Sequence, residues 1–350
     1  MNEKGTDVLQ QYDLDIIRTS RVRGAVLCET RQGCRLLKEY KGTEARMEQV
    51  QQVLAQLEEC TGVAVDRAIP NREGKWISLD GDQTPYVVKE WNSGRECDLL
   101  EEQEVLRGVH LLALLHQGLR QVDSSSFTLE DSLHKEYSRH NAELRRARNF
   151  VRKVRHKSDF ELAMIETYSA FYEQAEEALR LLELWEQGED GALSSAENVT
   201  AKDHREASTG QGSLKEPVYH LCHGEYSHHH ILYDGVFAMI TDFLAMTRGV
   251  QVSDLYYLIR KAMEKQGFDC RIGQKMLEEY DRHLPLTEGD RRYLYIRFLY
   301  PEKYWKQINY YFNSNKAWIP ARSTEKIRAL QKLEPERQKF LEFLRQGGLC

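Results

Sequence analysis

The sequence predicts an α+β fold of two lobes: a small antiparallel sheet lobe in residues 1–91 and a larger helical lobe in residues 92–350. Three observations lead to this prediction. Short runs with strand-like alternation, separated by turn residues, fill the first ninety residues. Long runs with helical periodicity follow Trp91. The length of 350 residues is sufficient for two separate hydrophobic cores.

The predicted sheet lobe begins with a hairpin. Its strands are residues 25–30 and 34–40, and the Arg-Gln-Gly sequence between them forms the turn. A helix is expected at residues 43–59, where Thr43 can cap the first turn. Apolar residues recur there at helical spacing: Met47, Val50, Leu54 and Leu57.

Two more strands complete this lobe, and helices make up most of the other. The strands are expected at residues 76–79 and 86–91, on either side of the turn-prone Asp-Gly-Asp sequence. Helical patterns occur at residues 99–118, 131–157, 159–187, 253–266, 271–282, 288–300, 302–312 and 323–346. Residues 187–217 are rich in Gly, Ser, Ala and charge, which predicts a mobile insertion.

Composition excludes several classes of protein. The chain has 49 Lys and Arg against 55 Asp and Glu, and this net charge of −6 does not suit a nucleic-acid-binding protein. The longest apolar stretch, residues 111–115, is too short for a membrane span, and the N-terminus does not resemble a signal peptide. The seven cysteines are scattered and contain no CxxC motif, so we expect a chain made in a reducing compartment without a disulfide framework.

Lys38 is the first candidate for chemistry. Strand alternation places it on the same face as Cys34, Leu36 and Tyr40, where it is the only charge. An inward lysine needs an anionic partner, because burial of an unpaired charge is costly. Glu44 or Glu48, at the start of the following helix, could be that partner. Alternatively, Lys38 extends its amine to solvent from the end of the strand.

Residues 220–242 contain the second candidate group. Asp234-Gly235 is a hairpin signal between apolar strands at 231–233 and 236–240, so polar residues at 225–230 should lie near Asp242. Five histidines within residues 220–230 suggest zinc, but their spacing matches no standard zinc motif. The alternative is phosphoryl transfer, which needs a carboxylate at the acceptor hydroxyl and oxygen ligands for Mg²⁺.

Here the sequence resembles a known superfamily. Residues 223–232 read HGEYSHHHIL, residues 240–243 read ITDF, and Asp254-Leu255 follows twelve residues beyond Asp242. This pattern resembles the HGDxxxxNIL…IDF signature of the aminoglycoside phosphotransferase and choline-kinase-like proteins, which have a two-lobed fold like that of protein kinases. The resemblance implies ATP or GTP and Mg²⁺ as cofactors, with Asp242 as a catalytic residue that binds the metal.

The same resemblance assigns residues of the sheet lobe. Lys38 takes the place of the nucleotide-binding lysine, and Glu44 or Glu48 takes that of its helix partner. Val88 and Glu90 lie on the strand that would contact adenine through its backbone.

A narrower resemblance covers roughly residues 20 to 345. Residues 86–98, YVVKEWNSGRECD, and residues 301–319, PEKYWKQINYYFNSNKAWI, are similar to segments of bacterial spore-coat proteins of the CotS type. This resemblance implies a protein made in the mother-cell cytoplasm and deposited in the spore coat, with other coat proteins as partners. Cysteines such as Cys350 could then form late crosslinks.

The chain differs from an active kinase at two positions that take part in the reaction. Glu225 stands in place of the catalytic Asp, and His230 in place of the metal-binding Asn. Gly24 is present between the first strands, but no GxGxxG sequence surrounds it. We therefore expect a structural or assembly protein of the spore coat on a degenerate, pseudokinase-like fold that can retain weak nucleotide binding. The alternative is an active ATP-dependent phosphotransferase that modifies a hydroxyl group on a small molecule.

One predicted helical segment is strongly basic. Residues 139–157 contain eight Lys or Arg and one Glu. The basic residues are Arg139, Arg145, Arg146, Arg148, Arg152, Lys153, Arg155 and Lys157. They could bind an anionic partner, or they could form an ordinary solvated helix face.

Overall fold

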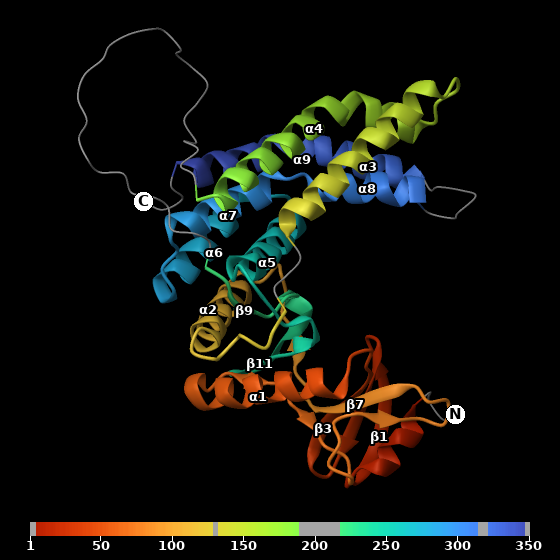
Figure 1. The fold of residues 1–350 in the computed structure, drawn as a ribbon, viewed down its shortest axis with the longest axis vertical. Coiled ribbons are helices and arrows are strands. Elements are labelled where there is room, and N and C mark those ends of the chain that lie inside the picture. The colour runs from red at the N-terminus through yellow and green to blue at the C-terminus, as the bar shows by residue number, and fades with distance from the viewer. Residues whose placement is uncertain (1–4, 129–131, 189–217, 314–320, 347–350) are drawn as a thin grey trace, which may run out of the picture. The chain divides into compact units, whose positions relative to one another are not determined.

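A computed structural model describes residues 5–128, 132–188, 218–313 and 321–346 (Figure 1). Most of the predicted insertion at 187–217 lies outside the described residues, as do Cys350 and the last residues of the 301–319 segment. The chain divides into two compact units. The first comprises Met1–Leu129, His220–Lys261 and Arg282–Leu284, and the second comprises Glu130–Tyr219, Ala262–Asp281 and Pro285–Cys350. The lobe boundary at residue 91 stays a prediction.

The main sheet of the first unit is antiparallel. Its strands are β1 (Ile16–Val22), β2 (Ala25–Thr30), β3 (Gly33–Glu39), β5 (Ala68–Ile69), β6 (Ser78–Leu79) and β7 (Pro85–Glu90). They are ordered β1-β2-β3-β7-β5, and β6 also pairs with β7. The hairpin predicted at 25–40 is β2–β3, whereas β1 is an additional edge strand. The strand β7 is central, since it has neighbours on both sides.

Each face of this sheet is covered by a different helix. The short 3-10 helix η1 (Thr6–Gln11) places Val8 and Leu9 against Leu37 and Val88. On the other face, α1 (Glu44–Thr61) packs Met47 against the strands (Figure 1). The predicted cap of α1 is confirmed, because the Thr43 hydroxyl accepts a hydrogen bond from the Arg46 amide at 3.2 Å. Side chains of Leu36 and Lys38 alternate with Leu37, so they point away from the η1 face.

A second, smaller sheet completes the first unit with α2 (Glu102–Leu119). Its order is β4 (Ala64–Val65), β11 (Phe237–Ile240), β10 (Ile231–Asp234) and β8 (Arg95–Glu96). The predicted hairpin is β10–β11, with Asp234 paired to Phe237, and Gly235 in its turn has a positive φ of 57°. The 3-10 helices η2 (His228–His230) and η3 (Phe243–Ala245) flank this hairpin, and β9 (His220–Cys222) pairs with β12 (Thr247–Gly249).

The second unit is helical. The helices α3 (Leu133–Lys153), α4 (Asp159–Glu186), α8 (Glu302–Asn313) and α9 (Ala321–Arg345) pack side by side (Figure 1). The helix α7 (Glu288–Leu299) packs on α4 and α9, and α6 (Cys270–His283) precedes it in the chain. Most of α5 (Val252–Lys265) belongs to the first unit, which includes residues up to Lys261. The core includes Leu144, Met164, Phe171, Tyr304 and Ile308. No helix in the described ranges is both long and apolar enough to cross a membrane.

Candidate functional site

The first unit contains a cavity of about 470 Å³ on the sheet face that carries Leu36 and Lys38. The β1–β2 turn, β3, the segment after β7 and the β10–β11 hairpin contribute its walls. Apolar side chains line part of it: Val22, Ala25, Leu27, Leu36 and Leu232. Polar groups converge on the rest, including Lys38, His230 and Asp242. Such a combination is typical of a small-molecule site.

Lys38 and Asp242 form an ion pair inside this cavity. The Lys38 Nζ lies 2.6 Å from the Asp242 Oδ2, and the two side chains are 27% and 19% exposed. The face of the strand predicted for Lys38 is therefore confirmed, but its partner differs from Glu44 or Glu48. The Glu44 carboxylate accepts hydrogen bonds from the amides of Trp76 and Ile77, at 2.6 and 3.2 Å. Glu48 is exposed.

The backbone holds Asp242 in an unusual conformation. Its φ of 68° and ψ of 55° are left-handed, a region that costs most residues roughly 1–2 kcal/mol. The Asp242 amide donates to Asp66 Oδ2 at 2.9 Å, which fixes the turn between β11 and η3. Burial acts to raise the pKa of Asp242, but the positive charges of Lys89 and Lys38 outweigh it and hold that pKa below its usual value. The carboxylate is thus kept ionised.

A second ion pair lies beneath the first. Lys89 Nζ is 2.8 Å from Asp66 Oδ2, and both side chains are almost fully buried, at 3% and 1% exposure. Burial raises the pKa of the Asp66 carboxyl even though Lys89 opposes this effect. Asp66 also lines the cavity. Sequence reasoning gave neither residue a role: Lys89 lies in the 86–98 segment without a neighbouring sign of its buried partner, and Asp66 belongs to no motif.

The structure brings His230 to this cavity, but it does not bring the Glu225 carboxylate. His230 Nε2 lies 3.6 Å from Asp242 Oδ2, and its Nδ1 donates to the Glu225 carbonyl oxygen at 2.7 Å. The side chain of Glu225 is exposed and is not among the residues that line the cavity. Glu225 therefore positions His230 through its backbone.

Buried hydrogen bonds support the segment that carries Glu225 and His230. The Asp254 carboxylate accepts the amides of His223 and Gly224, at 2.7 and 3.0 Å, and lies 3.2 Å from His116 Nε2. His223 Nε2 donates to the Thr241 carbonyl oxygen at 2.9 Å, and burial lowers the pKa of His223 to about 4. Because His223, His229 and His230 each contact a different partner, this arrangement favours structural roles over a shared zinc ion.

Val88 and Glu90 lie in β7, where the sheet already uses their backbone. Val88 is paired with Leu37 on one side and Ile69 on the other, and the Glu90 amide donates to the Arg67 carbonyl at 2.8 Å. Their role in nucleotide binding stays a prediction. The cavity is instead lined by residues that directly follow this strand, namely Trp91, Ser93 and Gly94. They belong to the 86–98 segment, but sequence reasoning gave Ser93 and Gly94 no individual role.

The turn between β1 and β2 is too short to wrap phosphate groups. Val22 pairs with Ala25, so only Arg23 and Gly24 form the turn, and Gly24 has a positive φ of 65°. Phosphate-binding loops use several consecutive backbone amides for this purpose. Among the described residues that line the cavity, Lys38 and Arg23 carry positive side chains, and Lys38 is the less exposed of the two.

The residues present fit a nucleotide better than they fit two metal ions. The cavity volume is within the range of ligand pockets, with apolar walls for a base and Lys38 for a phosphate. Asp242 Oδ1 is buried and has no hydrogen-bond partner among the described groups, so it could hold one Mg²⁺. His230 offers nitrogen where Mg²⁺ prefers oxygen.

Comparison with protein families gives a match over residues 6–344, with the family described as "Spore coat putative kinase YutH". The chain belongs to this family. The expected relationship to spore-coat proteins with a kinase-like fold is therefore confirmed. Comparison with curated proteins gave no match.

Solved structures show the same fold. An aminoglycoside phosphotransferase from Alicyclobacillus acidocaldarius subsp. acidocaldarius has a TM-score of 0.81 at 17% identity, over 99% of this chain and 97% of the other. Spectinomycin phosphotransferase APH(9)-Ia, in complex with ADP and spectinomycin, has a TM-score of 0.58 at 12% identity, over 94% of each chain. Amicoumacin kinase hAmiN gives 0.55 at 13% identity, over 97% and 96%. The YutH-family chain thus has the aminoglycoside phosphotransferase-like kinase fold, as its sequence predicts.

Proposed function

We propose that the chain is a structural or assembly protein of the spore coat that binds a nucleotide in its cavity without efficient phosphoryl transfer. The observation that carries the proposal is the Lys38–Asp242 ion pair within a cavity that the Glu225 carboxylate does not line. Lys38 and Asp242 are the charges that we assign to the nucleotide, whereas the exposed side chain of Glu225 does not line this cavity. Spore-coat family membership supports the location and the other coat proteins as partners.

We expect inefficient phosphoryl transfer because of the residues at positions 225 and 230. A catalytic carboxylate must lie close to the acceptor hydroxyl, and a displacement of about 1 Å can reduce the rate by ~10²-fold. Glu225 is one methylene longer than the expected Asp, and its side chain is exposed. His230 replaces an oxygen ligand for Mg²⁺ with an imidazole. Each change weakens transfer more than it weakens binding of the nucleotide.

Titration with ATP and GTP, with and without Mg²⁺, tests this proposal. We expect a thermal shift with nucleotide that depends weakly on Mg²⁺. Replacing Lys38 by Met should weaken binding by about tenfold or more, the usual effect of losing a charged hydrogen bond. Lys41→Met is the matched control, because the side chain of Lys41 is 88% exposed. Absence of nucleotide binding at millimolar concentration, or an equal loss in both variants, would contradict the proposal.

The alternative is an active small-molecule phosphotransferase, and the unpartnered Asp242 Oδ1 favours it. It requires sustained nucleotide turnover with a hydroxyl acceptor, abolished by Asp242→Asn. The double variant Glu225→Asp/His230→Asn separates the two hypotheses. If these positions limit transfer, the double variant should turn over ATP faster than the natural chain. If the natural chain is already an efficient enzyme, the double variant should be no faster.

A further inference from the structure

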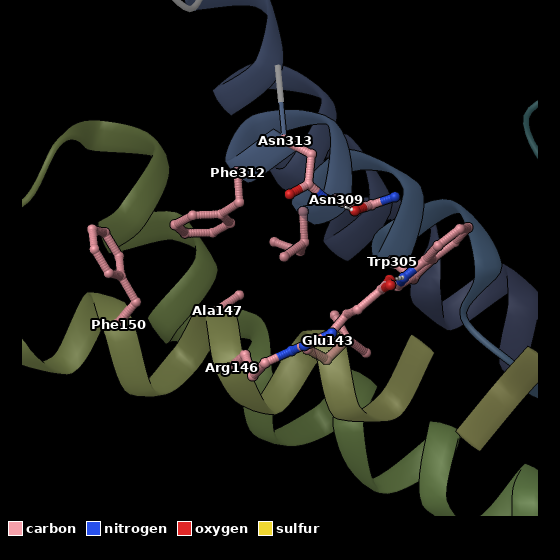
Figure 2. Close-up of a pocket in the computed structure, with 10 residues that line it drawn as sticks. Glu143, Arg146, Ala147, Phe150, Trp305, Asn309, Phe312 and Asn313 are labelled. Atoms are coloured by element: carbon pink, nitrogen blue, oxygen red, sulfur yellow. Dashed lines mark hydrogen bonds between the residues drawn. The ribbon is translucent and has the colours of Figure 1, made fainter. Parts of the chain in front are cut away.

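The second unit has a cavity of its own, of about 550 Å³, between α3 and α8 (Figure 2). Its floor consists of the apolar side chains of Leu144, Ala147 and Ile308, which also belong to the core of this unit. Its sides are aromatic and come from both helices. They are formed by Phe150, Trp305 and Phe312. The cavity is thus a recess with an apolar floor and aromatic sides. None of its lining residues lines the cavity of the first unit.

All three aromatic side chains make contacts that hold them in place. The Trp305 indole N–H donates to the Glu143 carboxylate at 2.8 Å, and the Trp305 ring stacks on buried His140 with centroids 3.3 Å apart. Phe150 and Phe312 meet edge to face, with centroids 5.7 Å apart. Phe150 is nevertheless 58% exposed to solvent. An exposed phenyl group at the edge of an apolar recess is typical of a surface that binds a partner.

A basic stripe on α3 runs past this recess. Arg139, Arg146 and Lys153 are spaced seven residues apart, so they lie on one face of the helix. All three are exposed, and Arg146 itself lines the recess. Within the described residues Arg146 has no ion pair or hydrogen bond to another side chain. The neighbouring Glu143 is engaged by Trp305, which leaves Arg146 available to an anion.

We propose that the recess and the basic stripe together bind an acidic segment of another polypeptide. The segment inserts one aromatic or aliphatic side chain among Phe150, Trp305 and Phe312, and its carboxylates meet Arg146 and the stripe. An apolar side chain of the partner is needed to fill the apolar floor. Negative charges beside that side chain are needed to pair with the basic stripe. A polypeptide supplies both an apolar side chain and carboxylates, and a nucleic acid is the competing occupant that the test distinguishes.

Fluorescence anisotropy with two labelled polymers tests this proposal on the full chain. One is a random copolymer of glutamate and tyrosine, and the other is polyglutamate of the same length. The copolymer should bind roughly tenfold more tightly, because it can bury a phenol ring in the recess. Phe150→Ala should remove this advantage and leave binding of polyglutamate unchanged. Arg146→Glu should weaken binding of both polymers by about tenfold.

Arg152→Glu is the matched control for charge. It makes the same charge change on α3, but position 152 lies about 120° around the helix from position 146. It should alter binding of either polymer by less than about twofold. Equal affinity for the two polymers, or an equal loss in Arg152→Glu and Arg146→Glu, would overturn the proposal. So would displacement of the copolymer by a single-stranded oligonucleotide at lower concentration. These outcomes are independent of nucleotide binding in the first unit.

Discussion

At the scale of single residues, two lysines and two aspartates form a connected set at the cavity of the first unit, where Lys38, Asp66 and Asp242 line the cavity and Lys89 lies beneath them. Lys38 pairs with Asp242, the Asp242 amide bonds to Asp66, and Asp66 pairs with Lys89. The four side chains sum to zero formal charge. Their burial differs, since the Lys89–Asp66 pair is almost fully buried while Lys38 is 27% exposed. The inner pair therefore supports the fold, and the outer pair lines the cavity where water reaches it.

This difference in burial predicts different effects on stability. Lys89→Met leaves Asp66 as an uncompensated buried charge and should lower the free energy of unfolding by about 3–5 kcal/mol. Lys38→Met should cost only about 1 kcal/mol, because water reaches Asp242 and Lys89 remains nearby. Urea denaturation of the two variants measures both values. The double variant Lys89→Met/Asp66→Asn removes both charges but keeps an oxygen that can accept the Asp242 amide, so it should recover much of the loss, and failure to do so would contradict the pairing.

Buried histidines predict how stability depends on pH. Burial lowers the pKa of His223 and of His140 to about 4, whereas in the unfolded chain each has a pKa near its ordinary value. Between about pH 6.5 and 4 the unfolded state therefore binds protons that the folded state does not. Stability is full above this window and falls as the pH drops through it, by about 2 kcal/mol for each histidine at pH 5.

Denaturation at pH 7 and pH 5 measures this loss. His140→Phe keeps an aromatic ring against Trp305 and should make the difference between the two pH values smaller. His156→Gln is the control, because His156 is exposed, and it should leave the difference unchanged. A natural chain equally stable at both pH values would contradict the interpretation.

Residue-level prediction succeeded where the information was local. Strand alternation assigned Lys38 to the face that carries the cavity, since a period of two depends only on neighbouring residues. It could not identify Asp242 as the partner, because that contact joins residues 204 positions apart. The sequence did not indicate the buried Lys89–Asp66 pair. A lysine within an apolar strand is expected to be exposed unless an anionic partner is known.

At the scale of elements, helices were predicted well because they carry long periodic patterns and caps. The α4 helix (Asp159–Glu186) matches the pattern at 159–187, and it begins with a complete capping box between Ser158 and Glu161. By contrast, β1 (Ile16–Val22) was missed. This edge strand has no buried residue along its length, so its sequence lacks the alternation that marks a half-buried strand.

The capping box on α4 gives a prediction at this scale. The Ser158 hydroxyl accepts the Glu161 amide at 3.3 Å, and the Glu161 carboxylate accepts the Ser158 amide at 2.7 Å. Ser158→Ala should therefore lower the free energy of unfolding by about 1 kcal/mol. Chemical denaturation measures the change. Ser158→Asp retains a capping group and should lose less, so an equal loss in the two variants would contradict the role of the cap.

At the scale of the whole molecule, sequence patterns identified the kinase-like fold and the spore-coat family. The order of motifs along the chain was sufficient, because the fold tolerates low identity: 17% identity accompanies a TM-score of 0.81. The details of the cavity were not predictable in this way. Trp91, Ser93 and Gly94 follow β7 rather than lie in it, and which residues line a cavity depends on how strands pair.

The left-handed backbone at Asp242 has an evolutionary consequence. Glycine adopts this conformation without strain, so Asp242→Gly would relax the backbone and delete the carboxylate in the same step. Relief of this strain offsets part of the stability lost with the Lys38 ion pair, so selection for folding alone should tolerate glycine at this position. A lineage that stops using the cavity can accept this replacement at little cost in stability, whereas a lineage that depends on the carboxylate must resist it. The residue found at position 242 across descendants would thus record which of them still depend on a ligand.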